Sequence, residues 1–154
     1  MKESLFTLFL FLMIGTSGFA CSCIGESDIR QEVRSTDYIF KGKVVSIEVI
    51  TIENEEFPNL KFSQQKVTIE LEKKYKGRLS KNMKITLFTG MGGGDCGFKF
   101  NLDQSYIVYA DKIKEGFRLN EGRGKILGTN ICKRTTSDIE GETKELAGIF
   151  KRKG

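Results

Sequence analysis

Apolar and polar residues alternate over long stretches of this chain, and the pattern predicts a β-rich domain. Val67, Ile69 and Leu71 alternate with polar residues, which is typical of a strand with one buried face. The segment 37–50 is rich in β-branched and aromatic residues, which favour strands. Its apolar alternation changes phase near Gly42, as a β-bulge requires. We therefore expect two strands here, the first of them bent.

Three further segments complete the predicted sheet. A third strand is expected over 83–88, and the segment 106–110 is apolar at every position, which predicts a strand buried on both faces. Residues 117–119 and 125–129 flank a Gly-rich turn and predict a hairpin. Five or six antiparallel strands with minor helices indicate an all-β fold, a small Greek-key barrel.

Two short helices and one loop are expected around these strands. Residues 27–34 form the first predicted helix, with Ser27 as its cap and Asp28 in its first turn. The polar, acidic segment 51–60, which holds the only proline, predicts a loop. A weak helix is expected over 137–150, although two glycines lower its helical propensity. Its inward-facing residues are predicted to be Ile139, Leu146 and Ile149.

The first residues have the pattern of a secretion signal. An apolar run over 5–15 follows a basic residue and precedes small residues at Gly18 and Ala20. The run is too short to span a bilayer comfortably. We therefore expect a signal peptide over 1–20, cleavage before Cys21, and a secreted or extracytoplasmic protein. A lipoprotein signal, with an acyl anchor on Cys21, stays open as an alternative, although Gly18 stands where such signals carry a branched aliphatic residue.

The cysteines point to disulfides. The mature chain carries Cys21, Cys23, Cys96 and Cys132, an even set in an oxidising compartment, which predicts two bridges. A structural zinc site is the competing interpretation. It is disfavoured because the cysteines form one C-x-C and two single residues rather than C-x-x-C pairs, and because the chain has no histidine.

Charge and composition narrow the function classes. The net charge is +5, from 25 Lys and Arg against 20 Asp and Glu, and the two signs are interspersed. The positive balance permits binding to acidic glycans, whereas the interspersed signs favour an ordinary solvated surface. Nucleic acid is not expected as a partner, and no second apolar stretch predicts a membrane span. Without histidine, and with no recognisable acid–base set, the chain is not expected to be an enzyme or to need a cofactor.

The order of these features resembles a known family, the tissue inhibitors of metalloproteinases, in their N-terminal netrin-like domain. The matching segments are Cys21-Ser22-Cys23, 37–44, Tyr75-Lys76-Gly77, Cys96-Gly97, Tyr106-Ile107-Val108 and Ile131-Cys132. The resemblance implies an OB-type barrel over 21–135, followed by a C-terminal extension over 136–154. It also implies a pairing of Cys21 with Cys96 and of Cys23 with Cys132, which staples the N-terminus to the barrel.

The resemblance also implies a function, inhibition of zinc metalloendopeptidases. The α-amine and carbonyl of Cys21 would ligate the catalytic zinc of the protease, and Ser22 would face its specificity pocket. The connector Gly93, Gly94 and Asp95 would contact the other side of the cleft. Asp95 is an unusual residue there, because an electronegative protease site would repel its charge. The alternative function is a non-inhibitory netrin-like binding module of the cell envelope or matrix.

Overall fold

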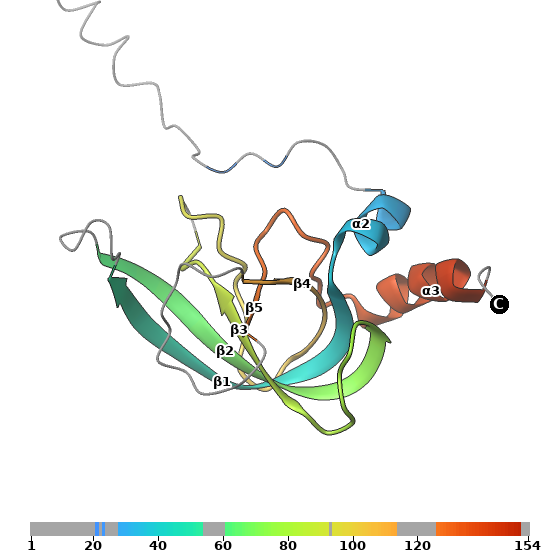
Figure 1. The fold of residues 1–154 in the computed structure, drawn as a ribbon, viewed down its shortest axis with the longest axis horizontal. Helices are drawn as coiled ribbons and strands as arrows, with labels where there is room; N and C mark the ends of the chain where they lie inside the picture. Colours follow the sequence, from blue (N-terminus) through green and yellow to red (C-terminus); the bar gives the residue numbers. More distant parts are fainter. Residues whose placement is uncertain are drawn as a thin grey trace, which may run out of the picture.

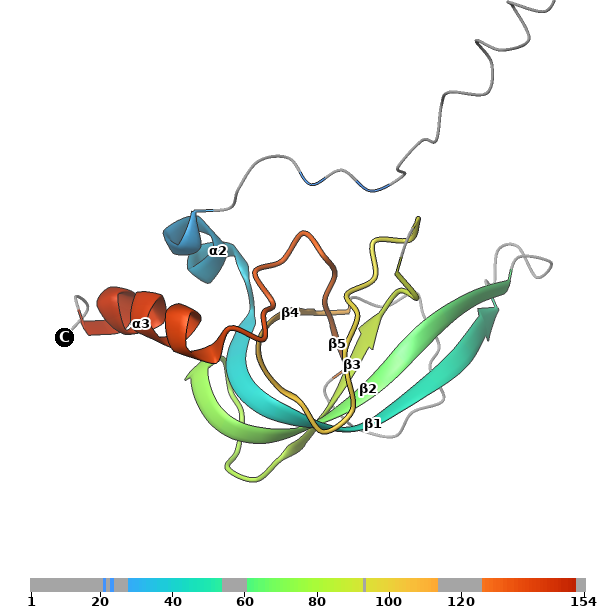
Figure 2. The same cartoon turned by 180° about the vertical axis from the view of Figure 1, so that it is seen from behind.

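The computed structural model describes residues 21, 23, 28–53, 61–92, 94–113 and 126–151. These residues form a five-stranded sheet and two helices (Figures 1 and 2). In chain order the elements are α2 (Ile29–Ser35), β1 (Tyr38–Glu53), β2 (Lys61–Lys76), β3 (Lys84–Thr89), β4 (Ser105–Lys112), β5 (Ile126–Gly128) and α3 (Ile139–Phe150). The predicted signal peptide over 1–20 and the predicted turn over 121–124 lie outside the described residues.

The strands pair in the order β1-β2-β3-β5-β4, and β4 pairs back with β1, so the sheet closes on itself. β1 and β2 form a long hairpin whose register runs from Ile39 opposite Lys76 to Glu53 opposite Lys61. The segment 51–53, which was expected to be loop, therefore continues β1. This correction arises because cross-strand pairing with β2 outweighs the polar composition of the segment.

β1 bends where the sequence predicted a bulge. Register shifts occur between Ile39 and Phe40, between Lys41 and Gly42, and between Val44 and Ser46. A side chain at Gly42 would collide with Ile69 and with the backbone of Glu70, so the bend needs a residue without a Cβ. The shifts let β1 curve far enough to pair with both β2 and β4.

One strand pair is parallel, which corrects the expectation of a purely antiparallel sheet. β5 runs antiparallel to β4 but parallel to β3, with Leu87 opposite Leu127. The reason is geometric: directions cannot alternate around a closed ring with an odd number of strands, so at least one neighbouring pair must run the same way. The five strands and the β-rich class agree with the sequence-based expectation.

The core lies in two layers on the two faces of the sheet. β4 contributes to both, with Tyr106, Val108 and Ala110 on the inside of the ring and Ile107 and Tyr109 on the outside. All five side chains are buried, as the uniformly apolar segment predicted. The outer layer is covered by the two helices, α2 and α3 (Figure 1).

Both helices are capped by aspartates. Asp28 caps α2 through a bond from the Arg30 amide to its carboxylate, 3.2 Å long. The sequence analysis gave the cap to Ser27, which lies outside the described residues. The correction has a physical basis, since the helix starts one residue later than expected and a carboxylate suits its positive end.

The C-terminal helix is confirmed, and it starts at a tight cap. Asp138 caps α3 through a bond from the Gly141 amide, 3.0 Å long, and a side chain at position 141 would overlap the Asp138 carboxylate. The glycine that weakened the helix prediction therefore leaves room for the capping carboxylate. Ile139, Leu146 and Ile149 pack into the outer core layer as expected. None of the helices in the described part of the chain is long and apolar enough to cross a membrane.

Candidate functional site

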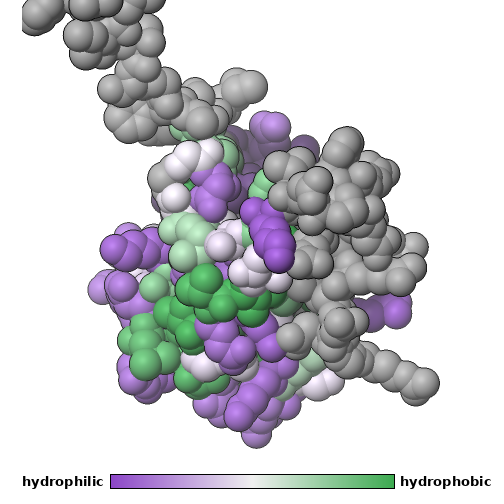
Figure 3. Space-filling view, turned by 90° about the vertical axis from the view of Figure 1, so that its left-hand side faces the viewer, coloured by the Kyte–Doolittle hydropathy of each residue, from purple (hydrophilic) through white to green (hydrophobic). Residues whose placement is uncertain are grey.

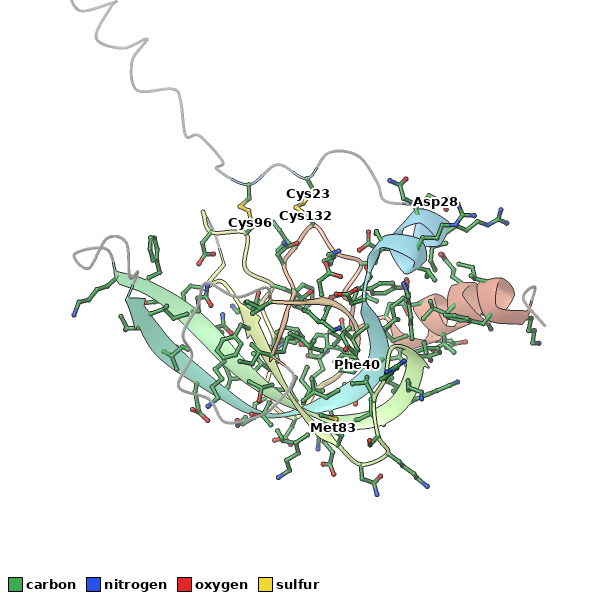
Figure 4. The ribbon with its side chains drawn as sticks, viewed as in Figure 1. Cys23, Asp28, Phe40, Met83, Cys96 and Cys132 are labelled. Carbon is green, nitrogen blue, oxygen red and sulfur yellow. A yellow bond between two sulfur atoms is a disulfide. The ribbon has the colours of Figure 1, made fainter. Side chains whose placement is uncertain are left out.

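Two disulfides fasten the N-terminal segment to the rest of the domain (Figure 4). Cys21 is bonded to Cys96 and Cys23 to Cys132, with Cα–Cα distances of 5.4 and 5.2 Å. The pairing is the one that the family resemblance implied, and it leaves no free cysteine in the part of the chain that the structure describes. The bridges close loops with sequence separations of 75 and 109 residues. In the chain-entropy model a loop of this length stabilises the fold by about 4 to 5 kcal/mol.

The two loops that receive these bridges are themselves joined. The Ile131 amide donates a hydrogen bond to the Cys96 carbonyl, 3.0 Å away. Directly after Cys132, the Lys133 ammonium contacts the carboxylates of Asp111 at 2.7 Å and Glu32 at 3.5 Å. Burial lowers the pKa of Lys133, but these two carboxylates outweigh it and hold that pKa above its ordinary value. The two loops that carry the bridges are therefore bonded to each other, and Lys133 links them to α2 and β4.

Asp95 organises the connector that leads to the first bridge. Its carboxylate accepts hydrogen bonds from the backbone amides of Met91, Gly92 and Gly97, the last two at 2.8 and 3.2 Å. Partial burial raises the pKa of Asp95, but the bonds from these amides outweigh it and hold the pKa below its ordinary value. The carboxylate thus points back into its own loop, where backbone N–H groups offset its charge.

The backbone of this connector is tightly folded. A side chain at Gly97 would overlap the carbonyl of Gly90, so the two ends of the loop touch through bare backbone. Gly92 has a φ of 92° and Cys96 a φ of 59°. Positive φ is uncommon for a residue with a side chain and costs some free energy, which the surrounding bonds must offset. The disulfide therefore starts from a residue whose orientation is fixed by a specific turn.

The structure brings together some of the predicted site residues. The sulfur of Cys21 lies 3.5 Å from the carbonyl oxygen of Gly94, and Gly94 and Asp95 are both exposed. Because a disulfide sulfur carries no hydrogen, this is a van der Waals contact rather than a hydrogen bond. Cys21 is half-buried. Ser22 and Gly93, which the sequence analysis placed in the same site, lie outside the described residues.

A groove of about 580 Å³ adjoins the connector. Its lining residues come from the start of β2 and from the connector: Lys61, Phe62, Ser63, Gln64, Gly90, Met91 and Asp95. The space-filling view of this end of the molecule shows an apolar area bordered by polar residues (Figure 3). Phe62 and Met91 are 46% and 41% exposed, so their apolar side chains contribute to the surface of the groove.

The sequence analysis missed the residue that holds this groove together. The side-chain amide of Gln65 donates to the carbonyl oxygens of Gly90 and Met91, at 3.4 and 3.5 Å, and the side chain is buried. The sequence could have predicted that Gln65 faces inward, because it lies two and four positions before the inward-facing Val67 and Ile69. A polar residue on a buried face has to find a partner, and here the partner is the connector.

The most strongly perturbed titratable groups lie elsewhere and are structural. Tyr109 donates a very short hydrogen bond to Glu142, which also binds Arg134 at 2.8 Å. Burial, followed by the Glu142 carboxylate, raises the pKa of Tyr109, and the bond to Glu142 raises that of Arg134. These groups satisfy one another between β4 and α3, and Glu142 is buried. The network therefore anchors the helix and has no free group to offer a substrate.

Among the described residues, no group of three or more cysteines or carboxylates is placed to hold a metal ion. Neither a protein-family model nor a curated protein matches this chain. Its function therefore has to be inferred from the stapled N-terminal segment and the surfaces around it.

Proposed function

We propose that this protein inhibits zinc metalloendopeptidases through a TIMP-like, netrin-like domain with an OB-type barrel. The inhibitory group is the N-terminus that forms when the leader is removed before Cys21. Its α-amine and the carbonyl oxygen of the same residue ligate the catalytic zinc of the protease and displace the hydrolytic water. The zinc belongs to the target, and the inhibitor brings no metal or cofactor of its own.

The chemistry of this ligation follows from the residue itself. An α-amine and its own carbonyl oxygen close a five-membered ring on a metal ion. The amine has a reference pKa of about 8, so a metal ion readily replaces its proton near neutral pH. Catalytic zinc sites keep one coordination position for water or substrate, and that position is open to the amine.

One observation carries the proposal: Cys21 and Cys23 are bonded to two loops that share a backbone hydrogen bond, from Ile131 to Cys96. A terminus held in this way loses little conformational freedom when it enters a protease cleft. Less of the interaction free energy is then lost to ordering, which favours tight binding.

The neighbouring residues have assigned roles in this proposal. Ser22 faces the specificity pocket, and Gly93, Gly94 and Asp95 contact the other side of the cleft. Gly94 is exposed and in contact with the Cys21 sulfur, so it reaches the same partner surface. Repulsion between Asp95 and an electronegative site is reduced, because three backbone amides already bind its carboxylate.

The decisive experiment adds one alanine before Cys21. We expect the protein with the natural terminus to inhibit members of a panel of zinc endopeptidases, and the extended protein to lose that inhibition. The extension does not touch the sheet, so circular dichroism and the disulfide count from intact mass should stay unchanged and serve as the control. Equal inhibition by the extended protein would disprove zinc ligation by the amine. Intact mass also tests the alternative of an acyl anchor on Cys21, which would block the amine.

A second candidate function is a non-inhibitory binding module of the cell envelope or matrix. The observation that favours it is a basic groove between β2 and α3. These two elements meet on the side of the domain away from Cys96 (Figures 1 and 4). A module of this kind would leave every protease in the panel fully active.

A further inference from the structure

A groove of about 460 Å³ runs between the end of β2 and the last turns of α3. Two of its lining residues are aromatic and three are lysines. The full set is Lys73, Lys74, Tyr75, Thr143, Ala147, Phe150 and Lys151. Among the described residues no carboxylate lines it, although acidic residues make up nearly half of the charged residues of the chain.

Within the described residues, none of Lys73, Lys74 and Lys151 forms an ion pair. Lys41 and Lys133, by contrast, each contact a carboxylate at 2.7 Å. The positive charge of the groove is therefore not compensated from within the described residues, and it is available to an anionic ligand.

The floor of the groove is apolar and rigid. The Tyr75 hydroxyl is hydrogen-bonded to the Thr143 hydroxyl at 3.1 Å, which ties β2 to α3. The Lys73 ammonium lies 4.9 Å from the centroid of the Tyr75 ring, a cation–π distance that fixes this lysine at the rim. Phe150 packs against the outer core layer and still lines the groove. Flat apolar surface is thus bordered by positive charge.

Protection of a strand edge explains only part of this arrangement. β3 pairs with β2 only over 65–70, so the end of β2 has a strand neighbour on one side, and lysines on such an edge discourage pairing with another chain. That role accounts for Lys73 and Lys74. It does not account for Lys151, which comes from the other wall of the groove, or for the aromatic floor.

We infer that this groove binds an anionic polysaccharide. A sugar ring has an apolar face that suits the Tyr75 and Phe150 surface, and its sulfate or carboxylate groups project from the ring edge towards the lysines. A membrane is a poorer match, because the charges surround a hollow rather than a protrusion. The inference does not depend on zinc ligation by Cys21, and it supplies a site and a ligand class for the second candidate function.

The test uses the full disulfide-bonded chain after leader removal, with dextran sulfate as the probe and uncharged dextran as the blank. A triple variant, Lys73→Gln with Lys74→Gln and Lys151→Gln, should bind dextran sulfate about tenfold more weakly, since each lost ion pair contributes modestly. The matched control replaces the exposed lysines Lys84, Lys99 and Lys112 by glutamine, which gives the same net charge. It should change binding by less than about threefold. Equal losses in the two variants would overturn the inference in favour of diffuse charge attraction.

A second variant separates a saccharide from other anions. Phe150→Leu keeps the apolar volume but removes the flat ring, so it should weaken dextran sulfate binding by about threefold while leaving poly-glutamate binding unchanged. Tighter binding of poly-glutamate than of dextran sulfate would identify an acidic peptide instead. Groove-dependent sedimentation with anionic phospholipid vesicles, without dextran sulfate binding, would identify a membrane. The chain with an extra residue before Cys21 should still bind dextran sulfate, so failure of this inference can be told from failure of protease inhibition.

Discussion

The Asp95 carboxylate accepts a hydrogen bond from the backbone amide of Gly92, 2.8 Å away. This bond closes the turn that carries the first disulfide, because Gly92 has a positive φ and Asp95 immediately precedes Cys96. An acid that looked unfavourable in a protease-binding loop is thus part of what gives the loop its shape.

Removing this carboxylate should destabilise the protein in a pH-dependent way. A carboxyl whose pKa is lower in the folded chain stabilises the fold above its unfolded pKa of about 3.9, and this contribution is lost as the pH falls through the folded pKa. Because Asp95 is exposed, we expect Asp95→Ala to cost only about 1 kcal/mol at about pH 7. The cost should shrink towards about pH 2.5. Urea unfolding at both pH values measures it. A cost that is independent of pH would contradict the role of the carboxylate.

The buried network of α3 should be far more sensitive than its exposed neighbour. Glu142 and Glu145 both contact the Arg134 guanidinium, at 2.8 and 3.1 Å, but only Glu142 is buried. Glu142→Ala leaves Arg134 and Tyr109 without their shared partner and should lower the free energy of unfolding by about 3 kcal/mol. Glu145→Ala should cost less than about 1 kcal/mol. Chemical denaturation compares the two, and similar losses would show that the network does not anchor the helix.

Lys76 should stabilise the C-terminal end of α2. Its ammonium donates to the carbonyl oxygens of Val33, Arg34 and Thr36, where a positive charge suits the helix dipole. We expect Lys76→Met to cost about 1 to 2 kcal/mol and to increase hydrogen exchange of the α2 amides. Lys74→Met is the control, since Lys74 forms no ion pair within the described residues. Protection of the α2 amides that is unaffected in Lys76→Met would count against this capping role.

Opening the first bridge should weaken the protein without unfolding it. The sheet and its two core layers do not involve Cys21 or Cys96, whereas the bridge constrains the unfolded chain. The double variant Cys21→Ala with Cys96→Ala should therefore keep its circular dichroism spectrum and lose about 4 kcal/mol of stability. Thermal and urea unfolding test this expectation. A variant that fails to fold would show that the core depends on the bridge.

The predictable parts of this fold are those set by local pattern. Alternation at Val67, Ile69 and Leu71 gave the buried face of β2, and the apolar run of β4 gave a strand with two buried faces. The phase change at Gly42 gave the bulge in β1. Each of these signals is contained within a few neighbouring residues, so the sequence alone carries it.

The parts that escaped prediction depend on closure and on distant partners. The parallel contact of β3 with β5 follows from the odd number of strands in the ring, which no single segment reveals. Lys133 contacts Asp111 in β4 and Glu32 in α2, which are far from it in the sequence, so no local spacing predicts these contacts. For Gln65 the sequence pattern predicted a side chain on the buried face, but it did not reveal that the side chain binds the connector.

The shortest strand has a consequence for how the molecule comes apart. Within the described residues β5 has three residues, and two of them pair with β4. A closed sheet separates most easily between the two strands that share the fewest hydrogen bonds, here β4 and β5. Cys132 lies four positions after the last residue of β5. The Cys23–Cys132 bond joins the segment that follows β5 to the N-terminal segment. Without this bond, the segment that follows β5 is constrained only by its own contacts, so we expect β5 to be the strand whose amides exchange hydrogen first.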